Sequence, residues 1–250
     1  MCSSDLVQGG KSSLSHRADL PVNPASLMKL VTTSVALDTL GPAFTWRTPV
    51  SVDGPITDNE LRGNLYIRGS GDPKLVVESL WLLMRRIQAL GIRRIAGDII
   101  LDPSAFEVPP SDPAAFDGEP TKPYNATPEA LLINFKSVLL HWVPDPAQGV
   151  VRLHAEPPLA GWRWPATVPL SPGPCTDYRS SLKADFSNPA EWKFRGTYPA
   201  ECGERIWPVA YTEPATYAIR AIEGMWLAIG GQLSGRVRTG PVIAQARPVL

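Results

Sequence analysis

Apolar positions are densest near the start of the chain, between residues 27 and 40. Asn23 or Ser26 can cap a helix there, and Gly41 followed by Pro42 ends it. The apolar side chains occupy most faces of this helix instead of one stripe. We therefore expect a helix that is buried on all sides, unlike an amphipathic helix at a protein surface.

Strand and helix patterns alternate in the next part of the chain. A strand at 61–68 leads into the turn 69–73, and a helix at 75–90 is followed by a strand at 95–101. Such a strand–helix–strand run predicts a small α/β unit. Residues 103–128 are dense in proline, and we expect them to be irregular.

From residue 131 the pattern changes to strands joined by proline-containing turns, which is typical of β-hairpins. A helix begins near Thr212, which we expect to cap it, and ends at Gly230. A last strand is expected at 237–244. The strands predicted in the hairpin region are 131–143, 150–153, 181–186 and 192–197.

The composition indicates a folded, loop-rich chain. Of 250 residues, 44% are hydrophobic, 27 are proline and 20 are glycine, so there is material for a core and the chain is not of low complexity. Lysine plus arginine and aspartate plus glutamate both number 24, so no basic excess exists to neutralise nucleic-acid phosphates. No apolar run reaches the roughly 18 residues that a transmembrane helix needs.

The first ten residues lack the basic region, apolar core and small residues of a secretory signal. We interpret them, including Cys2, as non-native and expect that a signal peptide was lost there. Cys175 and Cys202 remain, 27 positions apart. A disulfide between them would contribute about 3 kcal/mol and imply an oxidising compartment, and we favour it. The alternative is two buried free thiols in a cytosolic protein.

Ser26 and Lys29 form a Ser-x-x-Lys motif in the first predicted helix. Residues three apart share a helix face, so the lysine amine can lie near the hydroxyl and act as its base if burial lowers the pKa of the amine. The helix N-terminus also favours a developing anion. Ser180 and Lys183 repeat the motif, but we expect them on a strand, where residues three apart face opposite sides.

The sequence around Ser26 resembles the active-site helix of serine penicillin-binding proteins. It is most similar to the D-alanyl-D-alanine carboxypeptidase/endopeptidase family of the penicillin-binding protein four type. Several blocks agree in order, and together the resemblance covers about residues 20–250. The blocks are 23–33, 36–42, 63–73, 97–106 and 123–135.

The resemblance implies an α+β multidomain fold. Residues 11–49 would form the first segment of a serine β-lactamase/transpeptidase-like domain that carries the Ser-x-x-Lys helix. Residues 50–128 and 206–242 would form an inserted α/β domain, which itself carries a β-rich insertion at 129–205. Residues 243–250 would return towards the transpeptidase-like domain.

The resemblance also implies a function. It is that of a periplasmic D-Ala-D-Ala carboxypeptidase or endopeptidase that acts on peptidoglycan stem peptides without a cofactor or a metal. Ser26 would be the nucleophile, Lys29 its base, and β-lactams would acylate the same serine. The alternative is a non-catalytic periplasmic protein that keeps these segments for binding or assembly, and an esterase or β-lactamase with the same dyad is a weaker possibility.

The sequence departs from the family in one respect. The family also uses a Ser-x-Asn and a Lys-Thr-Gly motif, and neither occurs in the 250 residues. Arg238-Thr239-Gly240 imitates the second motif, but we expect it to be a strand-and-turn element. We expect that the chain ends before the rest of its transpeptidase-like domain, and that this chain alone has negligible turnover.

Other residues are weaker candidates. Related enzymes carry an acidic residue that faces the substrate's free amino group, and Glu119 or Asp117 could supply it, although a solvated loop acid is the simpler interpretation. Gly69–Pro73 lacks the residues of a phosphate-binding loop, so we expect a glycine turn. His141, His154 and Glu156 lie on separate predicted strands without the paired spacing of metal ligands, so surface or hydrogen-bonded residues are the simpler interpretation.

Overall fold

The computed structural model describes residues 19–250. The described chain divides into two units between Thr45 and Trp46, and the second unit is Trp46–Leu250. In the first unit a turn of 3₁₀-helix, η1 (Ala25–Leu27), leads into the helix α1 (Met28–Leu40). Gly41 ends α1 with φ 80°, which glycine adopts without steric cost.

The helix α1 is exposed along its whole length. None of its residues is buried, and the side chain of Leu30 is 68% exposed. The prediction of a helix buried on all sides is therefore wrong for the described chain. The physical reason is that no other described segment of residues 19–45 folds over its apolar faces.

The second unit is built in part on a mixed five-stranded sheet of order β15-β6-β4-β1-β16. The strands β4, β6 and β15 are parallel to one another, while β1 is antiparallel to β4 and β16. Opposed residues such as Leu65 and Ile99 are fully buried, so this sheet has a continuous apolar core. Its strands are β1 (Val50–Val52), β4 (Leu65–Arg68), β6 (Ile99–Asp102), β15 (Val237–Thr239) and β16 (Arg247–Pro248).

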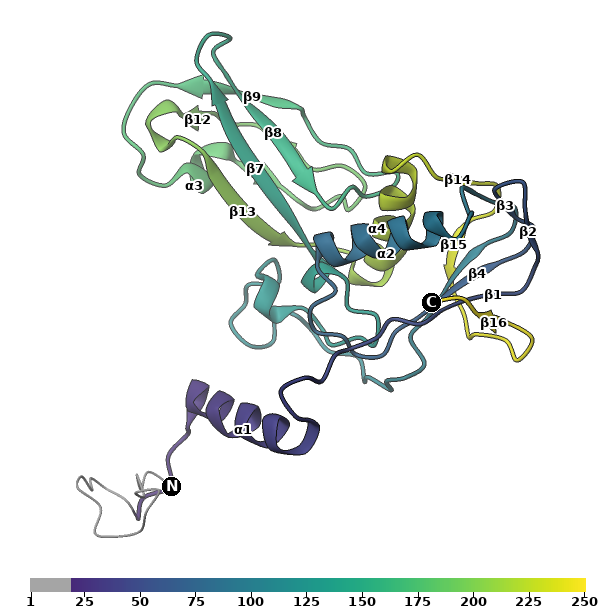
Figure 1. The fold of residues 1–250 in the computed structure, drawn as a ribbon. Helices are drawn as coiled ribbons and strands as arrows, with labels where there is room; N and C mark the ends of the chain where they lie inside the picture. Colours follow the sequence, from purple (N-terminus) through teal and green to yellow (C-terminus); the bar gives the residue numbers. More distant parts are fainter. Residues whose placement is uncertain (1–18) are drawn as a thin grey trace. The chain divides into compact units, whose positions relative to one another are not determined.

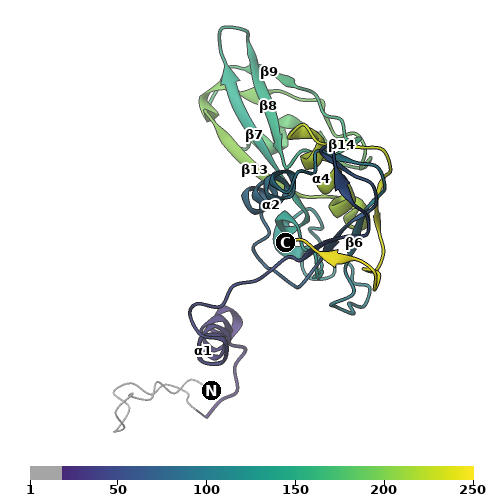
Figure 2. The same ribbon diagram turned by 45° about the vertical axis from the view of Figure 1, so that its right-hand side comes forward.

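Two helices, α2 (Val77–Ala89) and α4 (Pro214–Ala228), lie side by side in both ribbon views (Figures 1 and 2). Leu80, Met84 and Ile87 form the buried stripe of α2 at helical spacing. Beside them is a four-stranded sheet of order β14-β5-β3-β2. Its strands are β2 (Ile56–Thr57), β3 (Glu60–Leu61), β5 (Arg94–Ile95) and β14 (Gln232–Leu233).

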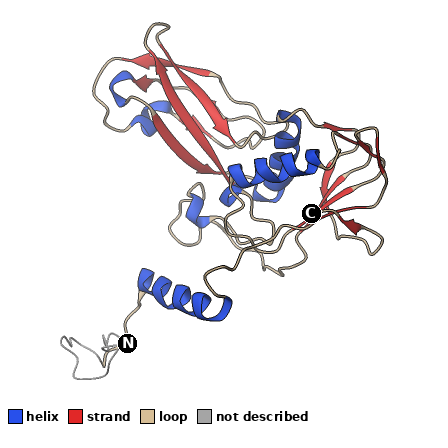
Figure 3. Cartoon of the chain, in the orientation of Figure 1, coloured by secondary structure: helices blue, strands red, loops and turns tan. Residues whose placement is uncertain are grey.

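A second five-stranded sheet, of order β12-β9-β8-β7-β13, forms the β-rich part of this unit (Figure 3). A cluster of aromatic rings packs in it, and Trp142 stacks on Tyr198 with ring centroids 5.8 Å apart. Cys175 and Cys202 form a disulfide here, with their Cα atoms 4.6 Å apart. The strands are β7 (Ser137–Asp145), β8 (Val150–Glu156), β9 (Thr167–Ser171), β12 (Tyr198–Pro199) and β13 (Arg205–Ala210).

Four local predictions are wrong. The strand expected at 237–244 ends at Thr239, since residues 240–244 form no strand. Residues 131–136 are not strand, because η3 (Asn134–Lys136) is a left-handed turn. The strand predicted from residue 181 is instead the end of helix α3 (Tyr178–Leu182), since the Asp177 carboxylate caps that helix. Thr212 does not cap α4, whose N-cap is Glu213. The remaining elements are η2 (Pro123–Asn125), η4 (Ala200–Cys202), β10 (Ala184–Asp185) and β11 (Lys193–Phe194).

Other predictions agree with the structure. The helix expected at 75–90 is α2, and residues 103–128 hold only η2 as regular structure. Among residues 19–250 no helix combines the length and the apolar character that crossing a membrane requires.

Candidate active site

Ser26 and Lys29 lie at the start of the first helical segment. Ser26 is the middle residue of η1 and Lys29 is the second residue of α1. Neither Asn23 nor Ser26 is the N-cap, because η1 begins after Pro24 and has no side-chain cap. The Asn23 side chain accepts a hydrogen bond of 2.9 Å from the Ala25 backbone N–H instead. Both candidate side chains are exposed, so the buried environment expected for the lysine is not found among the described residues.

The second Ser-x-x-Lys copy is helical too, contrary to the expectation of a strand. Ser180 belongs to α3, and Lys183 is the left-handed residue that ends it, with φ 48°. The Ser180 hydroxyl donates a hydrogen bond of 2.6 Å to the Asp177 carboxylate, which also caps the helix. The Ser180 hydroxyl is thus bound to the residue that caps its helix. Both serines lie in helical segments, so helical backbone alone does not show which of them is the nucleophile.

In the proline-rich segment, Asp117 is the centre of a hydrogen-bond network within its own loop. The Asp117 carboxylate accepts hydrogen bonds from the Tyr124 hydroxyl at 2.7 Å, the Asn125 side-chain amide at 2.7 Å and the Glu119 backbone N–H at 2.9 Å. The Tyr124 hydrogen bond, followed by the backbone one, lowers the pKa of Asp117 below its usual value. The Asp117 carboxylate therefore stabilises the conformation of this loop through the three hydrogen bonds that it accepts.

Glu119 is held more loosely. Its carboxylate lies 3.0 Å from the Lys122 ammonium, and both side chains are substantially exposed, at 55% and 38%. An exposed pair of this kind contributes little to stability and can exchange partners. Of the two acids, Glu119 is the one that can bind a ligand cation without dismantling the loop.

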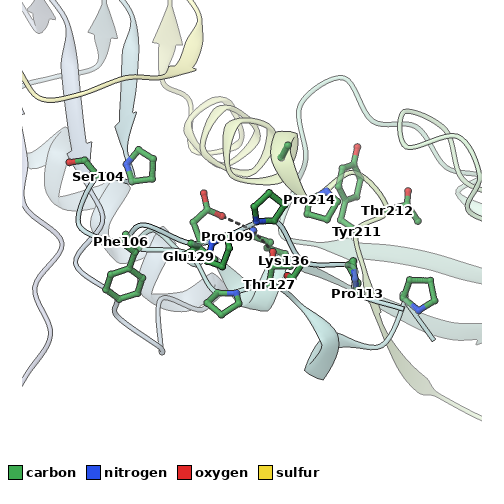
Figure 4. Close-up of a pocket in the computed structure, with 18 residues that line it drawn as sticks. Ser104, Phe106, Pro109, Pro113, Thr127, Glu129, Lys136, Tyr211, Thr212 and Pro214 are labelled. Atoms are coloured by element: carbon green, nitrogen blue, oxygen red, sulfur yellow. Dashed lines mark hydrogen bonds and ion pairs between the residues drawn. The ribbon is translucent and has the colours of Figure 1, made fainter. Parts of the chain in front are cut away.

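Next to this loop is a cavity of about 730 Å³ (Figure 4), lined by Pro120 and by residues from 103–113, 127–136 and 211–215. It holds Lys136, whose ammonium lies 2.9 Å from the Glu129 carboxylate and 3.0 Å from the Thr127 hydroxyl. No sequence prediction singled out these residues. The available signal was that Lys136 directly follows an apolar run. Its burial, however, depends on the turn η3, which the apolar pattern does not predict.

The remaining candidates have structural roles. Arg238 belongs to β15 and contacts Asp98 at 2.6 Å, which confirms the strand-and-turn interpretation of 238–240. A Cβ at Gly69 would collide with the backbone of Ala130, so the 69–73 turn needs glycine for close packing.

His141 belongs to β7, whereas His154 and Glu156 share β8, contrary to the expectation of separate strands. His141 lies opposite His154, and the His141 Nε2 atom is 3.4 Å from the Glu156 carboxylate. Within residues 19–250 no group of three or more histidine, cysteine or acidic side chains is arranged to hold a metal ion.

Comparison with known proteins gives a consistent family. Residues 5–250 match the family described as D-Ala-D-Ala carboxypeptidase 3 (S13). D-alanyl-D-alanine carboxypeptidase DacB of Haemophilus influenzae is 37% identical over 82 residues, which are 33% of this chain and 17% of the relative. A D-alanyl-D-alanine carboxypeptidase of Actinomadura sp. is 36% identical over 85 residues, or 34% of this chain and 16% of the relative.

The fold is similar to that of solved structures. Penicillin-binding protein 4 (dacB) of Haemophilus influenzae matches with a TM-score of 0.62 and 21% identity, covering 90% of this chain and 50% of that one. Its complex with a novel β-lactam matches with a TM-score of 0.54 and 20% identity, covering 90% and 47%. The chain thus spans about half the length of the solved chains that it resembles.

Proposed function

Because the chain belongs to the D-Ala-D-Ala carboxypeptidase 3 (S13) family, we propose that it carries the nucleophile and the base of a serine-type D-Ala-D-Ala carboxypeptidase or endopeptidase. Ser26 is the nucleophile and Lys29 the base. The observation that supports the proposal is the position of both residues at the beginning of one helix, inside the region matched to the family.

The proposed reaction is acyl transfer through an acyl-enzyme. Ser26 Oγ attacks the carbonyl carbon of the penultimate D-alanine, and Lys29 takes the hydroxyl proton. The peptide C–N bond then breaks, and the terminal D-alanine leaves with that proton on its amine. Water hydrolyses the resulting ester and restores the Ser26 hydroxyl. The N-terminus of the helical segment favours the negative charge that develops at the carbonyl oxygen.

We assign substrate recognition at the stem peptide to Glu119. A charge-assisted hydrogen bond would join its carboxylate to the free ammonium of a diaminopimelate or lysine side chain. The support is that Glu119 has one exposed partner, Lys122, whereas Asp117 accepts three hydrogen bonds from its own loop. Asp117 then positions Glu119, whose backbone N–H it binds.

The proposal extends to compartment, inhibitors and domain organisation. A periplasmic location is consistent with the disulfide between Cys175 and Cys202, and β-lactams would acylate Ser26. We retain the proposed division into a transpeptidase-like segment, an inserted α/β domain and a β-rich insertion. Because β13 pairs with β7, we extend the β-rich insertion through residue 210. Because β16 pairs with β1, we keep residues 247–248 with the α/β domain.

We propose that the 250 residues alone turn over negligibly. They contain neither a Ser-x-Asn nor a Lys-Thr-Gly motif, and the strand beside the latter supplies the second oxyanion donor in the family. Loss of one such donor costs roughly 10²–10³ in rate in other serine enzymes.

Release of D-alanine from diacetyl-Lys-D-Ala-D-Ala tests the proposal in the gene product as the cell makes it. We expect Ser26→Ala and Lys29→Ala each to lower kcat at least about 10³-fold. Ser180→Ala and Lys183→Ala, the matched changes in the second copy of the motif, should leave kcat unchanged. Full activity of Ser26→Ala would contradict the assignment and favour the non-catalytic alternative.

A further inference from the structure

The cavity beside the proline-rich segment has the character of a small-molecule or peptide site. Its volume of about 730 Å³ lies within the range of ligand pockets. Seven of the eighteen residues that line it are prolines, so a large part of the wall is rigid, apolar and without backbone N–H donors. In Figure 4 Lys136, Glu129 and Thr127 lie together among these prolines.

The ion pair in the wall leaves one donor and one acceptor open. The ammonium of Lys136 has three N–H donors, and Glu129 Oε2 and Thr127 Oγ1 take two of them. Among the described residues the second carboxylate oxygen of Glu129 accepts no hydrogen bond. The Lys136 side chain is only 9% exposed and that of Glu129 is 28% exposed, so water screens this pair weakly.

The backbone that carries Lys136 is strained. Asn134, Phe135 and Lys136 have φ of 43°, 53° and 50°, a left-handed run that side chains disfavour. Surrounding hydrogen bonds hold the run in place: Tyr211 N–H donates to the Lys136 carbonyl at 2.8 Å, and the Tyr217 hydroxyl donates to the Ser137 carbonyl at 2.7 Å. Strain that is over-determined in this way is concentrated at functional sites, and here it places the ammonium in the cavity wall.

The geometry points to a peptide-binding site in this cavity. A secondary amide of the ligand accepts a hydrogen bond from Lys136 through its carbonyl and donates one to Glu129 through its N–H. Small aliphatic side chains, such as those of alanine, pack on the proline rings. An amide satisfies both open positions, whereas a free carboxylate can only accept and is repelled by Glu129, so the site selects an amide over a carboxylate.

The apolar walls also discriminate against a sugar. The hydroxyl groups of a saccharide would lie against proline rings that offer no donors, and unpaired buried polar groups weaken binding. The inference rests on the proposed function in one respect, since it identifies the peptide as an alanine-containing segment of a peptidoglycan stem. Binding itself needs neither Ser26 nor turnover.

The probe is N-acetyl-D-alanyl-D-alanine methylamide, an uncharged peptide with no C-terminal carboxylate. Titration into the ¹⁵N-labelled 250-residue chain should shift the amide resonances of Ala130, Lys136, Thr212 and Ala215, with a dissociation constant on the order of 1 mM. N-acetylglucosamine, which carries an amide on a sugar, should shift them at least about tenfold less at equal concentration. Shifts confined to other residues, or stronger shifts with the sugar, would overturn the inference.

Variants separate recognition from folding. Lys136→Met alone leaves a carboxylate buried without its partner and can unfold the region, so the informative variant is Lys136→Met with Glu129→Leu, an apolar replacement of the whole pair. It should keep the spectrum of a folded chain and bind the peptide at least about tenfold more weakly. The control is Arg152→Met with Asp145→Leu, which removes an ion pair of 2.8 Å on β7 and β8 and should not change binding. Unchanged binding in the first variant would overturn the inference.

The outcome is independent of the proposed chemistry. Penicillin labelling of Ser26 in the gene product, together with no peptide binding in the cavity, would reject this inference and leave the proposed function standing. Peptide binding in the cavity without labelling of Ser26 would support this inference and reject the proposed function.

Discussion

At the scale of single residues, the structure distinguishes side chains that share a sequence pattern. Ser26 and Ser180 both begin a Ser-x-x-Lys motif on helical backbone, but the Ser180 hydroxyl is bound to the Asp177 carboxylate. Asp117 and Glu119 are two residues apart, yet the first is bound by three donors and the second by one exposed lysine. Hydrogen-bond partners, which a sequence does not show, therefore decide which residues are available for chemistry.

We expect Asp117→Ala to loosen residues 114–126, because the Tyr124 hydroxyl, the Asn125 amide and the Glu119 N–H all lose their acceptor. Hydrogen exchange at pH 7 should show the Glu119 amide exchanging several-fold faster. Glu119→Ala, the matched control in the same loop, removes only the exposed contact to Lys122 and should leave exchange of these amides nearly unchanged. Equal effects of the two substitutions would contradict the role assigned to Asp117.

The acid dependence of this loop has a defined sign. The pKa of Asp117 is lowered in the folded chain, so its contribution is fully present above the ordinary aspartate pKa of about 4. The contribution is lost as the pH falls through the lower folded value.

At the scale of elements, periodic patterns were predictable and local exceptions were not. The apolar spacing of 75–90 predicts a helix, and α2 is found at Val77–Ala89. The apolar run 131–143 predicts one strand, but its first part is a left-handed turn held by hydrogen bonds from Tyr211 and Tyr217, far along the chain. Such tertiary partners override local propensity, and the cavity around Lys136 was missed for the same reason.

Helix α4 offers a test of close packing. Alanine at Gly224 would favour the helix by about 1 kcal/mol, but its Cβ would collide with the Pro158 carbonyl. Two hydrogen bonds of 2.9 Å between Ala160 and Arg220 hold this loop against the helix, so it cannot easily withdraw. Overpacking of this kind costs about 1–3 kcal/mol, and we expect Gly224→Ala to lower the free energy of unfolding.

Urea unfolding measures this change. Ala228→Gly, at the exposed last residue of the same helix, is the control and should cost less than the roughly 1 kcal/mol of a helix interior. A Gly224→Ala chain that is more stable than the unsubstituted chain would show that the helix and the loop do not approach closely.

At the scale of the whole molecule, the fold of residues 46–250 rests on sheets that bring distant segments together. The strands β4, β6 and β15 come from residues 65–68, 99–102 and 237–239 and lie side by side in parallel. The sequence alone indicates an α/β unit and a hairpin region, but strand order follows from pairings that no local pattern encodes. The family resemblance supplies the catalytic hypothesis, whereas the exposure of α1 could not be foreseen from its apolar faces.

The disulfide links two segments of the β-rich part, and its removal tests the contribution of that link. A loop of 27 residues predicts a loss of about 3 kcal/mol for Cys175→Ser with Cys202→Ser. Urea unfolding followed by tryptophan fluorescence reports on this region, because Trp142 packs there. Cys2→Ser, at a residue outside the described range, is the control. An unchanged midpoint in the double variant would show that the link does not stabilise the fold.

The central claim is that Ser26 is the acylated nucleophile. The most direct measurement is to incubate the gene product, as the cell makes it, with benzylpenicillin and to map the covalent adduct by peptide mass spectrometry. We predict an adduct on Ser26 that is absent in Ser26→Ala and present in Ser180→Ala, with negligible labelling of the 250-residue chain alone. An adduct on another residue, or labelling that survives Ser26→Ala, would contradict the claim.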